Sequence, residues 1–295
     1  MVDIAARLQN PQTIFYWPYV VASFLIALIW LIFIGRKSLK QSFAYLFSAK
    51  IWLTSSTWID LQYSAIYLLF VRSLIVAIEA AVFVRVMKVT LSLASKFIPE
   101  SLWIQASSLT EGLIATIITM LAIDFSSYWV HRSMHLIPML WRVHATHHSA
   151  SHLTPLTTYR QHILEPMILN SCRAASSGMA LGVFHSIFID ATPVITVYGM
   201  GAGFFAYMFT TNLHHCHIPV RYPALLRAIL VSPHHHHIHH SSNPLHFDCN
   251  FGVVFSFWDR VFGTYRHEDI ALGELKFGVV RSVAKIELKA RGEAL

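Results

Sequence analysis

The sequence predicts an all-α fold: an integral membrane helical bundle of about four transmembrane helices with a cytosolic helical cap. Of the 295 residues, 55% are hydrophobic and only 13% are charged, whereas about a quarter of a soluble protein is charged. The mean hydropathy of +0.52 agrees with a membrane protein. All nineteen histidines lie between His131 and His267. Because nothing resembles a linker, residues 1–295 are expected to form a single membrane domain.

Residues 14–34 are the predicted first transmembrane anchor. This apolar run is about 20 residues long, which is enough to cross a hydrocarbon core of ~30 Å. It is followed by Gly35, Arg36 and Lys37, and the positive-inside tendency places that end in the cytoplasm. The run is too long for the apolar part of a cleavable signal peptide, so we expect it to remain as an anchor.

Further apolar segments cover about 65–93, 112–130, 163–183 and 193–212. Four charged residues interrupt the first of these, which is either two pieces or one partly buried helix. The last two form a predicted helical hairpin, so that residues before and after it lie on the same side of the membrane. A four-crossing arrangement then places all histidine clusters in the cytoplasm, and residues from about 219 onward form the cap of short helices and loops.

The net charge and the cysteine content limit which binding partners, disulfides and metal sites we expect. The net charge of +7 is explained by Arg and Lys in cytoplasmic loops and near anionic lipids. No basic run alternates with exposed aromatic residues, so we expect no nucleic-acid partner. Cys172, Cys216 and Cys249 form no CxxC motif, which argues against disulfides and against a thiolate metal site.

Three histidine clusters repeat one spacing, with imidazoles three or four residues apart. Such residues share one face of a helix, and imidazole suits iron, zinc, copper and nickel. Eight or more imidazoles exceed the needs of one tetrahedral zinc and fit a pair of metal ions. The alternative is that they are polar residues at helix ends and in surface turns. The candidate ligands are His131, His135, His144, His147, His148, His215, His236, His239 and His240.

Residues near these clusters are candidates for supporting roles. Asp124 and Tyr128 fall on the same helical face as His131 and His135. A charged residue at membrane depth is usually functional, so Asp124 is expected to support the site or to hold a ligand imidazole through its far nitrogen. His214 and His217 flank His215, and the sequence leaves open whether either of them also binds metal.

Other metal and hydrolase chemistries fit the sequence less well. A zinc protease of the His-Glu-x-x-His type lacks its general base here, and Glu-x-x-His pairs of soluble carboxylate di-iron bundles do not occur. The Pro-Cys-x-x-Cys segment of zinc deaminases and the Gly-x-Ser-x-Gly elbow of α/β-hydrolases are also missing. The remaining alternatives are a histidine-rich membrane protein for metal binding or transport, and a zinc-dependent lipid hydrolase.

Residues 120–266 resemble the fatty acid hydroxylase superfamily, which includes sterol desaturases and sphingolipid hydroxylases. The resemblance lies in three histidine boxes in order, the segments 124–135, 144–149 and 232–240, followed by a tail with Asp248-Cys-Asn250-Phe-Gly252 and the segment 258–265. We assign supporting roles to Asp248 and Asn250 from that tail. Many members have His-x-Asn between boxes two and three, where this chain has His215-Cys-His217.

The resemblance implies a membrane enzyme with a histidine-ligated centre of two iron ions, for which zinc is an alternative occupant. It implies hydroxylation or desaturation of a lipid C–H bond with dioxygen and two electrons. The His-Pro-Gly-Gly segment of a cytochrome-b-like donor does not occur in the sequence, so we expect a separate electron donor of cytochrome-b or ferredoxin type. Hydroxylation and desaturation use the same ligands, so both remain open, as does the lipid.

Overall fold

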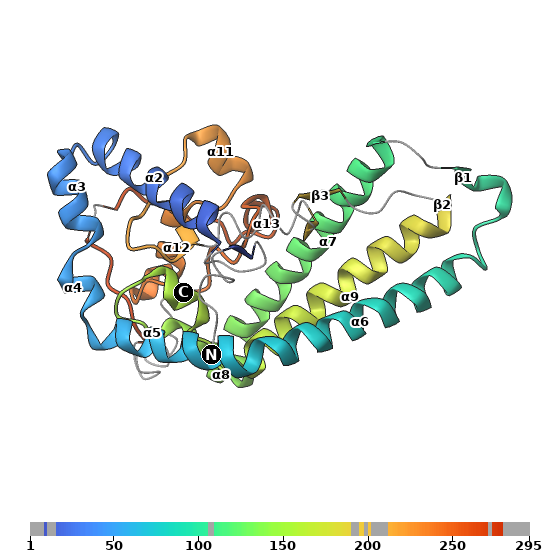
Figure 1. The fold of residues 1–295 in the computed structure, drawn as a ribbon, viewed down its shortest axis with the longest axis horizontal. Helices are drawn as coiled ribbons and strands as arrows, with labels where there is room; N and C mark the ends of the chain where they lie inside the picture. The colour runs from blue at the N-terminus through green and yellow to red at the C-terminus, as the bar shows by residue number, and fades with distance from the viewer. Residues whose placement is uncertain are drawn as a thin grey trace.

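The computed structural model consists of three long helices that extend from a cap of shorter helices (Figure 1). It describes residues 9–10, 16–105, 109–189, 195–197, 200–201, 212–270 and 273–279. The long helices are α6 (Arg72–Ala94), α7 (Leu109–Leu136) and α9 (Leu164–Ile187). Helix α9 packs against both α6 and α7. The predicted all-α class is therefore confirmed for the described residues.

The predicted anchor over 14–34 corresponds to helix α2 (Trp17–Phe33), which has Pro18 in its first turn. Its 17 residues reach about 26 Å, slightly less than a hydrocarbon core of ~30 Å. One face packs on the cap, where Ala27 and Leu31 join a core cluster with Leu213 and Ile218. Helix α3 (Leu39–Leu46) follows after a capping box at Ser38, and α4 (Ala49–Trp52) completes this region.

Two of the described helical stretches are long and apolar enough to cross a membrane. The first joins α5 (Ser55–Ile66), the π-turn η1 (Tyr67–Val71) and α6 into 40 continuous residues. Only 6% of its most apolar window is buried inside the protein. The charged residues of segment 65–93 thus do not divide it. The second is α7. The predicted segment 163–183 lies in α9, which is helical but less apolar because it carries Glu165, Asn170 and Arg173.

Of the predicted helix over 193–212, the structure describes residues 195–197, 200–201 and 212, and among these only Asn212 is helical. There, β3 (Thr196–Val197) pairs antiparallel with β4 (Met200–Gly201). Residues 195–197 are all β-branched and Gly201 is a poor helix former, which favours strands. Residues 190–194, 198–199 and 202–211 lie outside the described residues. A second short pair joins β1 (Ile104–Gln105), which follows η2 (Glu100–Leu102), in parallel to β2 (Phe188–Ile189).

Two glycines bring α9 very close to α6. A Cβ atom on Gly178 would lie 2.7 Å from the Phe83 carbonyl oxygen, and one on Gly182 would lie 2.8 Å from the Met87 carbonyl oxygen. Small residues four apart allow such backbone approach between helices. This contact fixes the position of α9 and of the polar side chains on it.

The cap holds the short helices α8 (Pro138–His148), α11 (Ala224–Ile229), α12 (Pro233–His239) and α13 (Phe257–Val261), with the turns η3 (Pro155–Tyr159) and η4 (Pro244–His246). A buried ion pair of 3.1 Å between Arg160 and Asp60 ties η3 to α5. Thr157 also donates its hydroxyl to Asp60 at 2.7 Å. The short helices after residue 219 agree with the predicted cap, whereas α8 and η3 were not expected to belong to it.

Candidate metal centre

Helices α7 and α8 provide the first histidines. His131 and His135 lie four residues apart near the end of α7, so they project from one face. Helix α8 begins directly afterwards at Pro138, a residue suited to the first helical turn. His144, His147 and His148 occupy its last turns and are buried. The close succession of the two helices turns both sets of rings toward each other.

Helix α12 provides the remaining cluster. It begins at Pro233, and the Ser232 side chain caps it by accepting a hydrogen bond from the His235 backbone. Every residue of this helix is buried, which is unusual for a segment with five histidines. His239 and His240 contact histidine rings of α7 and α8. His236 lies in one group with His147 of α8. His215 reaches the same place from the segment after residue 212.

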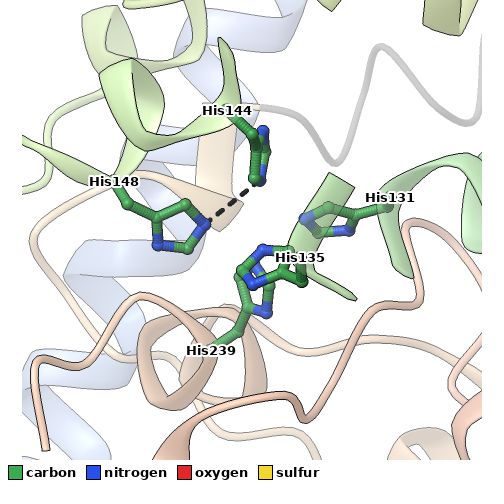
Figure 2. Close-up of side chains that lie close together, drawn as sticks. All are labelled: His131, His135, His144, His148 and His239. Carbon is green, nitrogen blue, oxygen red and sulfur yellow. Dashed lines mark hydrogen bonds between the residues drawn. The ribbon is translucent and has the colours of Figure 1, made fainter. Parts of the chain in front are cut away.

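The structure gathers all nine sequence-predicted histidines into two groups. Within each group, the nitrogens available to a metal lie within 4.8 Å of one another. Figure 2 shows the five rings of the first group arranged around a common space. The first group is His131, His135, His144, His148 and His239, and the second is His147, His215, His236 and His240.

Short distances between Nε2 atoms define the second group. His215 Nε2 lies 3.1 Å from His147 Nε2 and 2.9 Å from His236 Nε2, and His240 Nε2 lies 3.1 Å from His236 Nε2. Two nitrogens that bind one ion at about 2.1 Å and at right angles are roughly 3.0 Å apart. The spacing therefore fits imidazoles that share one ion.

The first group has nitrogens that only a ligand would satisfy. The buried Nε2 atoms of His135 and His239 have no hydrogen-bond partner among the described residues. Main-chain carbonyls contact the Nδ1 atoms of His131 and His239: His131 Nδ1 lies 2.9 Å from the Phe251 oxygen, and His239 Nδ1 lies 2.8 Å from the Cys249 oxygen. A proton on Nδ1 leaves the Nε2 lone pair for a metal, which is the usual arrangement of metal-bound histidine.

Two further contacts were not expected from the sequence. Glu165 Oε1 at the start of α9 lies 3.0 Å from His144 Nδ1, with both side chains buried. The Thr158 hydroxyl lies 3.1 Å from His215 Nδ1. A signal for Glu165 was present, because an acid in an otherwise apolar segment marks a functional position. No sequence signal distinguished Thr158.

Burial keeps the histidines neutral. It lowers the pKa of His144 to about 3 and that of His147 to about 4. For His148, His236 and His240, burial together with neighbouring imidazoles places the pKa well below its ordinary value. Neutral imidazoles offer lone pairs to a cation at neutral pH, so the protonation state of the cluster suits metal binding.

Among the described residues, no hydrogen bond joins Asp124 or Tyr128 to the clustered imidazoles, so the tether to an imidazole that we gave as one alternative for Asp124 is not seen. The Asp124 carboxylate accepts hydrogen bonds from the backbone of Val254 and Phe255 at 2.9 and 3.0 Å, and from Trp258 Nε1 at 3.0 Å. Tyr128 shares a hydrogen bond of 2.9 Å with Thr264. Both residues therefore hold the 254–264 segment against α7. They lie on the same face of α7 as His131 and His135, but earlier along the helix.

Asn250 lies between the two carbonyls that hold His239 and His131. It has φ of 55°, a left-handed conformation that asparagine tolerates. Its side chain donates to the His235 and Arg266 oxygens and accepts from the Arg266 backbone at 2.8 Å. Asp248, with φ of 57°, begins the same turn. Asp259, which the sequence reasoning missed, accepts from the backbone of Phe251 at 2.7 Å and of Gly252 at 2.9 Å.

The other histidines flanking the clusters lie outside both groups. His214 Nε2 contacts the Val231 oxygen at 3.2 Å. The His217 ring lies between Tyr45 and Trp52, with both its nitrogens buried and unpartnered among the described residues. The His214 ring lies 5.5 Å from that of His236, and His214 lines the small cavity beside the clustered histidines. Whether either residue binds metal therefore stays open.

Two adjoining cavities lead away from the histidines. The smaller, of about 80 Å³, is lined by histidines of both groups together with Glu165. The larger, of about 300 Å³, lies between α6, α7 and α9 and is mainly apolar. Arg173 and Val253 line both cavities. The two cavities therefore connect the apolar space among the long helices with the clustered histidines.

The model of the family described as fatty acid hydroxylase matches residues 116–264. The chain belongs to the fatty acid hydroxylase family. The matched range begins within α7 and includes all nine clustered histidines, and it agrees closely with the region 120–266 that carried the resemblance in the sequence.

Curated relatives include lipid-oxidising enzymes. Alkylglycerol monooxygenase of Homo sapiens is 31% identical over 149 residues, which are 50% of this chain and 30% of that protein. Ornithine lipid hydroxylase OlsE of Rhizobium tropici is 28% identical over 66% of this chain and 52% of its own length. Lathosterol oxidase of Mus musculus is 25% identical over 58% of this chain and 51% of its own length. The chain thus spans between 30% and 52% of the length of these relatives. No solved structure matches it.

Proposed function

We propose that this protein is a membrane-bound, non-haem di-iron oxidoreductase that hydroxylates a C–H bond of a lipid. The observation that carries the proposal is the pair of groups, of five and four imidazoles, in which all residues but the half-buried His131 and His135 are buried, beside a mainly apolar cavity. Membership of the family and the names of its relatives support lipid oxidation. Desaturation remains the alternative outcome, because the same centre can remove a second hydrogen.

The donor set favours two iron ions over zinc. All nine donors are imidazole nitrogens, which suit iron. A group of five exceeds the four ligands of structural zinc and the three protein ligands of catalytic zinc. When bound, the two iron ions would activate dioxygen and cleave the C–H bond. The alternative of a zinc-dependent lipid hydrolase would use a single, smaller cage.

The hydroxylation balances as R–H + O₂ + 2 e⁻ + 2 H⁺ → R–OH + H₂O. We propose that a separate electron-donor protein of cytochrome-b or ferredoxin type supplies the electrons. Within the chain, the carbonyls of Cys249 and Phe251 hold protons at Nδ1 of His239 and His131. Glu165 orients His144 from the far side. The apolar walls of the larger cavity exclude water from the reacting carbon.

The membrane arrangement is part of the same proposal. We place α5–α6 and α7 across the membrane, because both are apolar enough and the α5–α6 stretch has its apolar side chains largely exposed. The clustered histidines lie where α7 ends and in the cap helices α8 and α12. We propose that this end faces the cytoplasm. A transport protein would instead place its ionisable ligands along a path through the membrane.

Metal analysis and lipid analysis test the proposal together. Protein purified without added metal should contain about two irons per chain, since nine ligands exceed the capacity of one ion. Cells that express it should show lipids gaining the mass of one oxygen or losing that of two hydrogens. His147→Ala should abolish both the lipid change and the metal of the second group. One zinc per chain, or full activity of His147→Ala, would contradict the proposal.

A further inference from the structure

The cavity between α6, α7 and α9 is mainly apolar, but two of its walls carry charged side chains. Its sides are formed by residues such as Phe83, Met120 and Ile123, but Glu79 on α6 and Arg173 on α9 also line it. A second acid of the lining, Asp124, has its carboxylate occupied by the backbone of the 254–255 segment. Charged groups among membrane-spanning helices are costly and usually mark a substrate pathway.

Arg173 is held at the junction of the two cavities. Its Nε donates to the Ser127 hydroxyl at 2.7 Å, and its Nη1 donates to Asn170 Oδ1 at 3.4 Å. It lines the large cavity and also the small one beside the ligand histidines. A guanidinium has five N–H donors in a fixed plane, so Arg173 is suited to bind an acceptor oxygen next to the metal centre.

Glu79 lies on the α6 wall of the same cavity. Among the described residues, no hydrogen bond or ion pair reaches its carboxylate, although Arg173 and Arg72 influence it electrostatically. A half-buried carboxylate without a direct partner attracts a hydrogen-bond donor or a positive charge. The cavity therefore offers an acceptor on one wall and donors on another.

We propose that this cavity binds a lipid whose polar group is held between Glu79 and Arg173, with the hydrocarbon chain lying among α6, α7 and α9. The polar group carries a donor, such as a hydroxyl or ammonium, for Glu79, and an acceptor oxygen for Arg173. This inference rests on the proposed function. Because Arg173 lines both cavities, the oxidised carbon lies a few bonds from the polar group and not at the far end of the chain.

Binding to the metal-loaded full-length protein in lipid nanodiscs tests the site without requiring turnover. The probes are 1-O-hexadecylglycerol and hexadecane, which share a chain and differ in the polar group. The wild type should prefer the glycerol ether. Glu79→Gln and Arg173→Leu should each weaken its binding roughly tenfold or more, as expected for lost hydrogen bonds to a charged group, and leave hexadecane binding unchanged.

Arg85→Gln is the matched control, because Arg85 is an exposed residue of α6 outside the cavity. Metal content and melting temperature are measured for each variant. If Arg173→Leu does not fold, the nearly isosteric Glu79→Gln variant still decides the outcome. Unchanged preference for the glycerol ether in Glu79→Gln, with normal metal content, would overturn the proposal.

The position of oxidation provides a second readout. Product fragmentation in a mass spectrometer should place the new oxygen or double bond near the polar group. Oxidation near the chain terminus would refute the inference while supporting the proposed function. Conversely, selective binding that Glu79→Gln abolishes, without any oxidation by the reduced protein, would support the binding site and refute the proposed function.

Discussion

At the scale of single residues, the metal site depends on groups that contact the far nitrogens of the imidazoles. Main-chain oxygens of Cys249 and Phe251 hold two rings of the first group, and Glu165 lies against a third. Such partners fix ring orientation and increase the basicity of the ligand, and removing one typically lowers metal affinity 10- to 100-fold. These contacts join segments far apart in sequence, so spacing rules did not predict them.

We expect Glu165→Gln to lower the affinity of the first histidine group for iron by roughly 10- to 100-fold. The amide keeps the size of the side chain but loses the negative charge beside His144. Competition with a chelator measures the affinity. Glu268→Gln is the matched control, because Glu268 pairs with His246 at 3.0 Å outside both groups. Equal iron retention by Glu165→Gln and the control would contradict a role for Glu165.

Asn250→Ala should release metal from the first group and leave the second intact. The change removes the side-chain bonds to residues 235 and 266 and places alanine at φ of 55°, which is strained. The neighbouring carbonyls would then no longer hold His131 and His239. Metal stoichiometry should fall from two ions to about one. Asn243→Ala, at a different and exposed turn, is the control and should retain both ions. If Asn250→Ala also retained both ions, the turn at residues 248–250 would not be needed for the first group.

At the scale of helices and strands, the spacing of the histidines predicted which side chains share one face of a helix. The i, i+4 pair on α7 and the i, i+3, i+4 triplets of α8 and α12 project from one face each, and the structure brings them together. Asp124 shares the face of His131, yet its carboxylate binds the 254–258 segment, because periodicity does not reveal which partner lies opposite. The prediction over 193–212 was wrong at residues 196–197 and 200–201, which form two short strands because β-branched residues and glycine outweigh hydrophobicity there.

The contact between α6 and α9 gives a prediction at this scale. Gly182→Leu should destabilise the protein by about 1–3 kcal/mol or more, as expected for overpacking, because a Cβ there already meets α6 at 2.7 Å. The melting temperature measures the effect. Met179→Leu, an exposed position of the same helix, should change little. A Gly182→Leu protein as stable as the wild type would show that α6 and α9 are not closely packed.

At the scale of the whole molecule, the long helices supply the apolar cavity and the cap completes the metal ligands. The histidines of α7 meet those of α8, α12 and the segment at residue 215 only when the cap is folded. The sequence predicted this division from composition and histidine placement. It did not predict that α2 would pack on the cap core, because hydrophobicity alone does not separate lipid contact from protein contact.

Because the folded cap buries neutral histidines, we expect the stability of the protein to change with pH. Burial lowers the pKa of His144 to about 3 and that of His147 and His214 to about 4, whereas the unfolded chain has values near 6.5. Below about pH 6.5 these histidines bind protons in the unfolded state, whereas in the folded state they stay neutral. Each such histidine should therefore reduce the free energy of unfolding by about 1.4 kcal/mol per pH unit.

The melting temperature of the metal-free protein should be constant above about pH 7 and fall steeply between about pH 6.5 and 5. Metal-loaded protein should resist acid to a lower pH, because protons must displace the ion before they can occupy the ligand nitrogens. Scans of both forms across this range, with iron release followed in parallel, check the expectation. Since several histidines act together, a melting temperature of the metal-free protein that stayed level down to pH 5 would mean that the clustered imidazoles are accessible to water, and the buried dimetal site would have to be abandoned.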